Sequence, residues 1–189
     1  MEWRLTEIDK EFYSFATGKP FDHCIECDKH LLSPDCEYFI EKAVKKYEGF
    51  SAKDVIFEYA ICIDCAERLR QELSKESMAT IQQFFMQRVN MMDRVLASQH
   101  SEADQLTSSC LVSHATINEV NEYQLFAQCR GNSMVIGPMP YMISGSVLEE
   151  LSELLSKETR DELDNFSKRH FGPPPELAQP LPYERVLII

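Results

Sequence analysis

The sequence contains no uninterrupted apolar run that approaches the roughly 20 residues of a membrane-spanning helix. It also contains no glycine-rich phosphate loop, HExxH helix or nucleophile elbow, and its 5 histidines fall into no recognisable catalytic spacing. Charged residues such as Arg4, Glu7 and Asp9 interrupt the N-terminal segment, so that segment lacks a secretory core. We therefore expect a soluble, cytoplasmic protein that is not an enzyme and has no membrane partner.

Basic residues are scarce, because Lys and Arg total 19 against 31 for Asp and Glu, for a formal net charge of −12. The phosphate backbone of a nucleic acid repels such an acidic protein at long range. The best candidate for a local basic patch is Lys42, Lys45 and Lys46, on a helix predicted for residues 36–47 and diluted by neighbouring glutamates. A protein partner or a second copy of this chain is therefore expected before a nucleic acid.

Cysteine is well represented, and four of the seven cysteines form two CxxC pairs, Cys24 with Cys27 and Cys62 with Cys65. Two such pairs supply four soft ligands with the tetrahedral preference of Zn²⁺. Four thiolates fill the coordination shell and leave no position for water or substrate. The pattern predicts one structural zinc ion bound by these four residues.

Other interpretations of the cysteines stay open at this stage. A reducing compartment disfavours disulfides, but paired thiols there also serve redox chemistry. His23, His30 or Cys36 lies close enough in sequence to replace one of the four ligands. We expect these three to be surface or packing residues instead.

The two pairs differ in their surroundings. The first is followed by Asp28 and by residues typical of a turn, whereas a strand predicted for Val55–Ile61 leads into the second, which opens a helix from Ala66. This arrangement over residues 21–73 resembles the treble-clef group of zinc-binding folds. Many treble-clef knuckles carry Gly where this chain has Asp28. The resemblance implies the ligands Cys24, Cys27, Cys62 and Cys65.

The remaining pattern predicts an α+β fold. Residues 6–16 have the apolar spacing of a short helix, and residues 67–97 read as a long central helix with Ser74 and Ser77 as a candidate break. The apolar stripe of this long helix faces either the core or a partner. Its members are Met78, Ile81, Phe84, Phe85, Val89, Met92, Val95 and Leu96.

The polar segment 98–109 predicts a linker between units 1–98 and 99–172. In the second unit, Gly131-Asn132 marks a β-hairpin, and helices are predicted from a capping box at residues 146–149 and from about residue 157, ending at Gly172. A proline-rich tail, 173–189, is predicted to end in an edge strand over residues 186–189.

Cysteines recur in this second unit. Cys110 and Ser113 have the spacing of a CxxC pair without its second thiol. One interpretation is therefore that the second unit is a degenerate copy of the zinc module. Alternatively, Cys110, His114 and Cys129 supply three ligands of a second zinc ion. Packed, reduced thiols are the third interpretation.

The functional expectation is a zinc-stabilised protein that acts as a protein–protein interaction or adaptor module and forms homo-oligomers. Fold-level resemblance does not select among the functions of the treble-clef group. A zinc-dependent regulator associated with nucleic acid is the first alternative, and a thiol redox protein or an unrecognised enzyme is the second.

Overall fold

The computed structural model describes residues 3–49 and 53–172. These residues form one antiparallel sheet of six strands, six α-helices and a 3-10 turn at Lys10–Phe12. The strands are β1 (Arg4–Glu7), β2 (Glu37–Lys46), β3 (Lys53–Cys62), β4 (Glu122–Arg130), β5 (Ser133–Ile136) and β6 (Tyr141–Ser144). The helices are α1 (Ile63–Glu72), α2 (Lys75–Arg88), α3 (Met91–Ser98), α4 (Ala103–Leu106), α5 (Gly145–Glu153) and α6 (Lys157–Phe171).

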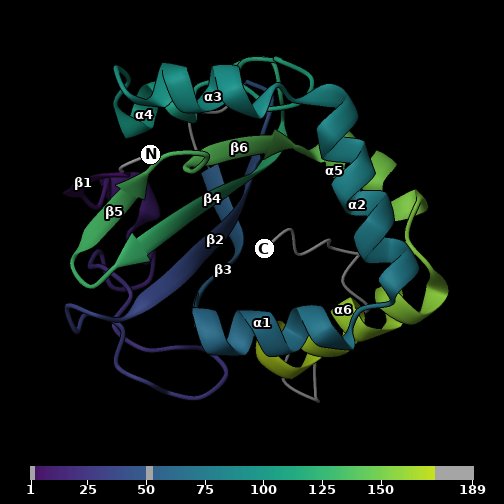
Figure 1. Cartoon of the computed structure of the whole chain (residues 1–189), viewed down its shortest axis with the longest axis horizontal. Coiled ribbons are helices and arrows are strands. Elements are labelled where there is room, and N and C mark those ends of the chain that lie inside the picture. The colour runs from purple at the N-terminus through teal and green to yellow at the C-terminus, as the bar shows by residue number, and fades with distance from the viewer. Residues whose placement is uncertain (1–2, 50–52, 173–189) are drawn as a thin grey trace.

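The strand order is β1-β5-β4-β2-β3, with β6 paired to β4. β5 and β6 lie end to end along the same edge of β4, because β5 pairs with residues 128–130 and β6 with residues 123–126. β2 pairs with β4 along its whole length, from Glu37 opposite Arg130 to Lys45 opposite Glu122. The helices form an arc that runs from α3 and α4 past α2 and α5 to α6 and α1, with the sheet across its open side (Figure 1).

The predicted helix over residues 36–47 is wrong, since this segment forms the central strand β2. Both edges of β2 are hydrogen-bonded, one to β3 and one to β4, and Tyr38 and Ile40 are at most 1% exposed. Glu, Lys and Ala favour a helix in isolation, but pairing and burial on both sides outweigh that local preference. The strand predicted for residues 55–61 is confirmed and is the middle of β3.

The predicted helix over residues 6–16 is also wrong. Residues 4–7 pair with β5 as β1, and Asp9 then caps the 3-10 turn by accepting a hydrogen bond from the Glu11 amide. Ile8 and Phe12 are buried as the pattern predicts, but Phe15 is 71% exposed. The apolar spacing arises from a strand and a turn, which sequence spacing alone does not distinguish from one helix.

The segment predicted to form one long central helix forms three helices, α1, α2 and α3. α1 ends at Glu72, and Ser74 caps α2 by accepting a hydrogen bond from the Ser77 amide, which confirms the predicted break. A second break follows at Val89 and Asn90, where Asn90 caps α3. In the predicted stripe, Phe84 and Val89 are buried, whereas Met92 and Leu96 are more than half exposed.

The second unit follows its prediction more closely. β4 and β5 form the hairpin around Gly131-Asn132, and α6 ends at Gly172. The predicted capping box does not form, because α5 begins at Gly145 with Ser144 as its N-cap and no side-chain cap. The proline-rich tail and its terminal strand lie outside the described residues.

One sheet and one buried cluster span both sides of the predicted boundary at residues 98–99, because β1 pairs with β5 and β2 pairs with β4. The predicted linker contains α4, whose Ala103 and Leu106 are buried. Arg4 in β1 also donates hydrogen bonds to this segment, at the Ser101 carbonyl. None of the helices in the described part of the chain is long and apolar enough to span a membrane.

Phe166 of α6 is fully buried, and its ring lies 5.4 Å from that of Tyr59 in β3. Phe166→Ala should lower the free energy of unfolding by about 3–5 kcal/mol, since it leaves a cavity between helix and sheet. The matched control is Phe15→Ala, which removes the same atoms from a side chain that is 71% exposed and should cost less than about 1 kcal/mol. Urea unfolding monitored by circular dichroism measures both; equal losses would contradict this packing.

Candidate metal centre

The first cysteine pair lies in a tight loop over residues 23–30. The Cys24 amide donates to the Lys29 carbonyl at 3.0 Å, and the Asp28 amide donates to the Cys24 carbonyl at 2.9 Å. Asp28 has a φ of 59°, in the left-handed region where glycine is usual and aspartate is tolerated. Asp28 thus closes the cysteine loop in a backbone conformation that is usual for glycine.

The second pair lies where β3 passes into α1. Cys62 is the last residue of β3 and the N-cap of α1, and Cys65 lies in the first helical turn. This position confirms the predicted placement of the pair at a helix N-terminus. The free amides and dipole at this end favour negatively charged sulfur.

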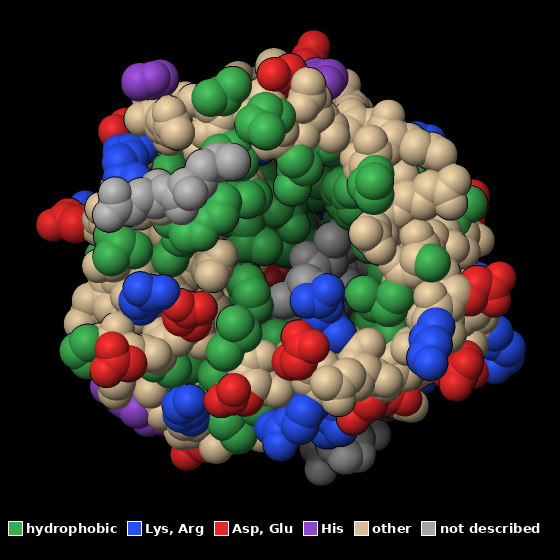
Figure 2. Space-filling view, viewed as in Figure 1, with side chains coloured by type: hydrophobic (Ala, Val, Ile, Leu, Met, Phe, Trp, Pro, Cys, Tyr) green, Lys and Arg blue, Asp and Glu red, His purple; other side chains and the backbone are tan. Residues whose placement is uncertain are grey.

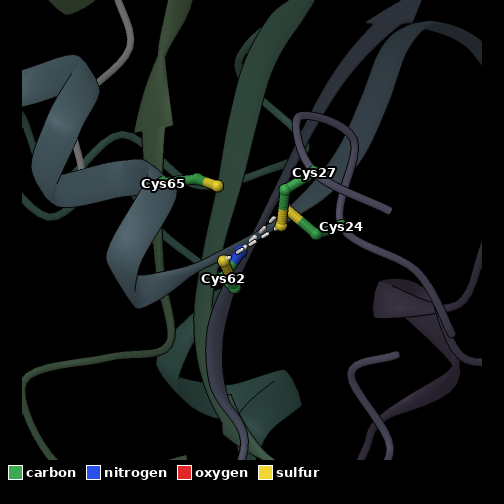
Figure 3. Close-up of side chains that lie close together, drawn as sticks. All are labelled: Cys24, Cys27, Cys62 and Cys65. Atoms are coloured by element: carbon green, nitrogen blue, oxygen red, sulfur yellow. Dashed lines mark hydrogen bonds between the residues drawn. The ribbon is translucent and has the colours of Figure 1, made fainter. Parts of the chain in front are cut away.

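The two pairs converge. The four Sγ atoms of Cys24, Cys27, Cys62 and Cys65 all lie within 4.8 Å of one another, and the Cys27 and Cys62 Sγ atoms are 3.8 Å apart. A tetrahedral zinc ion with bonds of about 2.3 Å separates its sulfur ligands by about 3.8 Å. Figure 3 shows the sulfur atoms of the loop pair facing those at the start of α1. This donor set and spacing fit a divalent metal ion.

Hydrogen bonds orient the sulfur atoms. The Cys62 amide donates to Cys24 Sγ at 3.3 Å, which ties the loop to the strand end (Figure 3). On α1, Arg68 Nη2 donates to Cys65 Sγ at 2.8 Å. A guanidinium beside the cluster offsets part of the negative charge that four thiolates bring to a metal site.

Burial makes the charge state of the cluster depend on a cation. Cys24, Cys62 and Cys65 are at most 3% exposed, and burial raises the pKa of the Cys62 and Cys65 thiols. Burial also raises the pKa of Cys27, but hydrogen bonds from the Lys29 backbone and the neighbouring thiols outweigh it, so the net shift is downward. A bound metal ion deprotonates coordinating thiols outright. A nearby cation would therefore favour the thiolate forms of Cys62 and Cys65 against the effect of burial.

The cluster is accessible from outside. Cys27 is exposed, and with Cys62 and Cys65 it lines a surface depression bordered by Lys29, Glu67 and other residues of α1. A metal ion can thus reach the thiols without unfolding of the chain.

The alternative ligands His23, His30 and Cys36 are not members of this cluster. His23 and His30 face each other across the base of the loop, with ring centroids 5.5 Å apart, and Cys36 is a buried free thiol. Cys110, His114 and Cys129 do not come together as a metal site within residues 3–49 and 53–172. The cluster of Cys24, Cys27, Cys62 and Cys65 is the single group of metal-ligating side chains found in those ranges.

Comparison with protein-family models, curated proteins and solved structures finds no match to this chain. The assignment of the centre therefore depends on its geometry. Sequence reasoning placed all four cysteines in one cluster but missed Arg68. The available signal was its position three residues after Cys65 on a predicted helix, which puts the two side chains on one face.

Arg68→Met should weaken zinc binding by about tenfold, because it removes a charged donor to a ligand sulfur while keeping the length of the side chain. The matched control is Arg70→Met on the same helix, where the guanidinium pairs with Glu67 and contacts no cysteine. Competition against a chromophoric chelator measures both affinities. Equal weakening by the two variants would point to net charge rather than the hydrogen bond to Cys65.

Proposed function

We propose that this chain is a structural-zinc protein in which one Zn²⁺, bound by Cys24, Cys27, Cys62 and Cys65, holds the fold for protein–protein interaction. The observation that carries the proposal is the mutual approach of four thiols, at most 4.8 Å apart, with no carboxylate or histidine in the set. Zinc prefers such soft donors, and four of them complete its tetrahedron. The ion would then have no open position for water, which favours a structural over a catalytic role.

The proposed ion joins three elements that the chain brings together from a distance. The loop at residues 23–30 precedes the β2–β3 hairpin, and α1 follows it. The hydrogen bond from the Ile25 amide to the Ala60 carbonyl, at 2.9 Å, holds the loop against β3. Loop, hairpin and helix in this order support assignment of residues 21–73 to a treble-clef-like zinc module.

A nucleic-acid role finds less support, because the lysines of the candidate basic patch are engaged by other groups. Lys42 is 5% exposed and lies 3.2 Å from the Glu58 carboxylate, and Lys45 lies 2.6 Å from that of Glu122. Lys46 donates to the Ile117 carbonyl. Acidic and basic side chains are interspersed on the face in Figure 2, without a basic patch.

The surface proposed for contact lies on α2 and α3, where Met86, Met91, Met92 and Leu96 are 72%, 45%, 58% and 54% exposed. Methionine side chains are flexible and polarisable, so they suit adaptable contacts between proteins. The occupant proposed for this surface is a second copy of the chain, since a self-complementary patch on two identical subunits makes the commonest soluble assembly.

The zinc assignment is tested by elemental analysis of purified protein. The wild-type chain should hold about one zinc per chain, and Cys62→Ser should lose both the zinc and the cooperative unfolding transition. Cys129→Ala is the control, because this thiol is buried in β4 away from the cluster and its removal should leave the zinc content unchanged. Metal-free wild-type protein with a native fold would contradict the proposal.

The contact surface is tested with the double variant M92S/L96S. It should weaken self-association by about tenfold or more, because two apolar side chains are lost from the interface, while the melting temperature stays near that of the wild type. Leu154→Ser is the control, since Leu154 is 51% exposed at the end of α5, outside this surface. Sedimentation equilibrium measures the association constants. A monomeric wild-type protein would overturn this choice of partner.

A further inference from the structure

The loop at residues 109–116 has the same backbone hydrogen bonds as the cysteine loop. The Cys110 amide donates to the Ala115 carbonyl at 2.8 Å, as the Cys24 amide does to Lys29, and the His114 amide donates to the Cys110 carbonyl at 3.0 Å, as the Asp28 amide does to Cys24. His114 has a φ of 60° and Asp28 one of 59°, and within the described ranges they are the only residues other than glycine with positive φ. The loops are therefore equivalent residue by residue.

The second half of the metal centre has a counterpart as well. Ser144 ends β6 and caps α5, just as Cys62 ends β3 and caps α1. The Ser144 amide donates to Cys110 Sγ at 3.3 Å, the same distance that separates the Cys62 amide from Cys24 Sγ. Val147, three residues after Ser144, occupies the place of Cys65.

The segments at the starts of α2 and α6 also resemble each other. Residues 73–77 read Leu-Ser-Lys-Glu-Ser and residues 155–159 read Leu-Ser-Lys-Glu-Thr, and Ser74 and Ser156 cap α2 and α6. Each segment donates to the other: the Ser74 amide to Thr159 Oγ1 at 3.0 Å, and the Ser156 amide to Ser77 Oγ at 2.9 Å. Reciprocal bonds of this kind are those of an isologous, two-fold contact.

The sheet has the same two-fold relation. β2 and β4 are antiparallel neighbours, Tyr38 of β2 lies opposite Cys62, and Tyr123 of β4 lies opposite Ser144. These pairings make β2 the counterpart of β4, with Glu41 matched to Phe126. Glu41 and Phe126 are also paired with each other across the β2–β4 ladder, which places the two-fold axis at the centre of the sheet.

We propose that residues 108–171 are a second copy of the module formed by residues 22–89, and that Cys110, Ser113, Ser144 and Val147 form a latent tetrahedral metal site. The four positions match Cys24, Cys27, Cys62 and Cys65 in order and in burial, with the second residue exposed and the other three buried in each set. Ser113 Oγ and Ser144 Oγ are 3.5 Å apart, close to the 3.8 Å between Cys27 Sγ and Cys62 Sγ.

Hydrogen bonds take the place of the metal in the second copy. Cys110 Sγ accepts from the Ser113 amide at 3.4 Å and from the Ser144 amide at 3.3 Å. One thiol with two neutral hydroxyls and a valine is a poor donor set for zinc, which prefers thiolate and imidazole. The natural chain therefore holds its second module together without an ion, and its zinc content is one.

The experiment restores the missing sulfurs in the full-length chain with S113C/S144C/V147C. This inference builds on the proposed zinc centre, so wild-type protein is measured in parallel. Elemental analysis should give about two zinc per chain for the variant against one for the wild type, and Co²⁺ titration should double the thiolate charge-transfer absorption. The matched control S101C/S108C/S133C adds the same number of thiols, none of them at the four positions, and should retain one zinc.

Each outcome decides one proposal. One zinc in both wild type and triple variant would overturn the latent site alone, whereas metal-free wild type would overturn the proposed function. If the triple variant does not fold, S113C/S144C changes only oxygen to sulfur and supplies three thiols with Cys110. Retention of a second Co²⁺ by that double variant would support the proposal, and a Co²⁺ content unchanged from wild type would overturn it.

Discussion

The antiparallel pairing of β2 with β4 is the interaction on which the rest of the structure depends. It joins the two parts of the chain through nine consecutive residue pairs, from Glu37 opposite Arg130 to Lys45 opposite Glu122. β3 pairs with β2, both β5 and β6 pair with β4, and β1 joins the sheet through β5. Because a central strand must satisfy both of its edges, the segment around Lys42 and Ala43 is fixed as β structure despite its helical composition.

The cysteine centre adds a second constraint at the end of this sheet. Burial disfavours the charged form of Cys62 and Cys65, while the Cys62 amide and Arg68 favour negative sulfur. A divalent cation would reconcile these opposing effects, because it deprotonates its ligands and offsets their charge. The proposed ion would link a loop, a strand and a helix that packing and hydrogen bonds also hold together.

The sequence predicted several parts of this arrangement from local chemistry. The two CxxC pairs predicted the four cysteines of the cluster, because thiols three residues apart share one turn and two such pairs make a tetrahedral donor set. The cap at Ser74 and the end of α6 at Gly172 were also predicted, since side-chain capping and glycine termination involve only neighbouring residues. The repeated Leu-Ser-Lys-Glu segments were present in the sequence, but a match of four residues acquires meaning only once each segment is seen to cap a helix and to contact the other.

The sequence by itself determined the donor chemistry of the candidate metal centre, the acidic character of the chain and the helix ends at Ser74 and Gly172, because each depends on residue type and short spacing. The tertiary structure decided that residues 37–46 are a strand, that Lys42 and Lys45 are ion-paired to carboxylates, and that Ser144 corresponds to Cys62. These features depend on partners far away in the chain. Hydrogen bonds and ion pairs between distant residues leave no local periodicity to read, so only the folded chain reveals them.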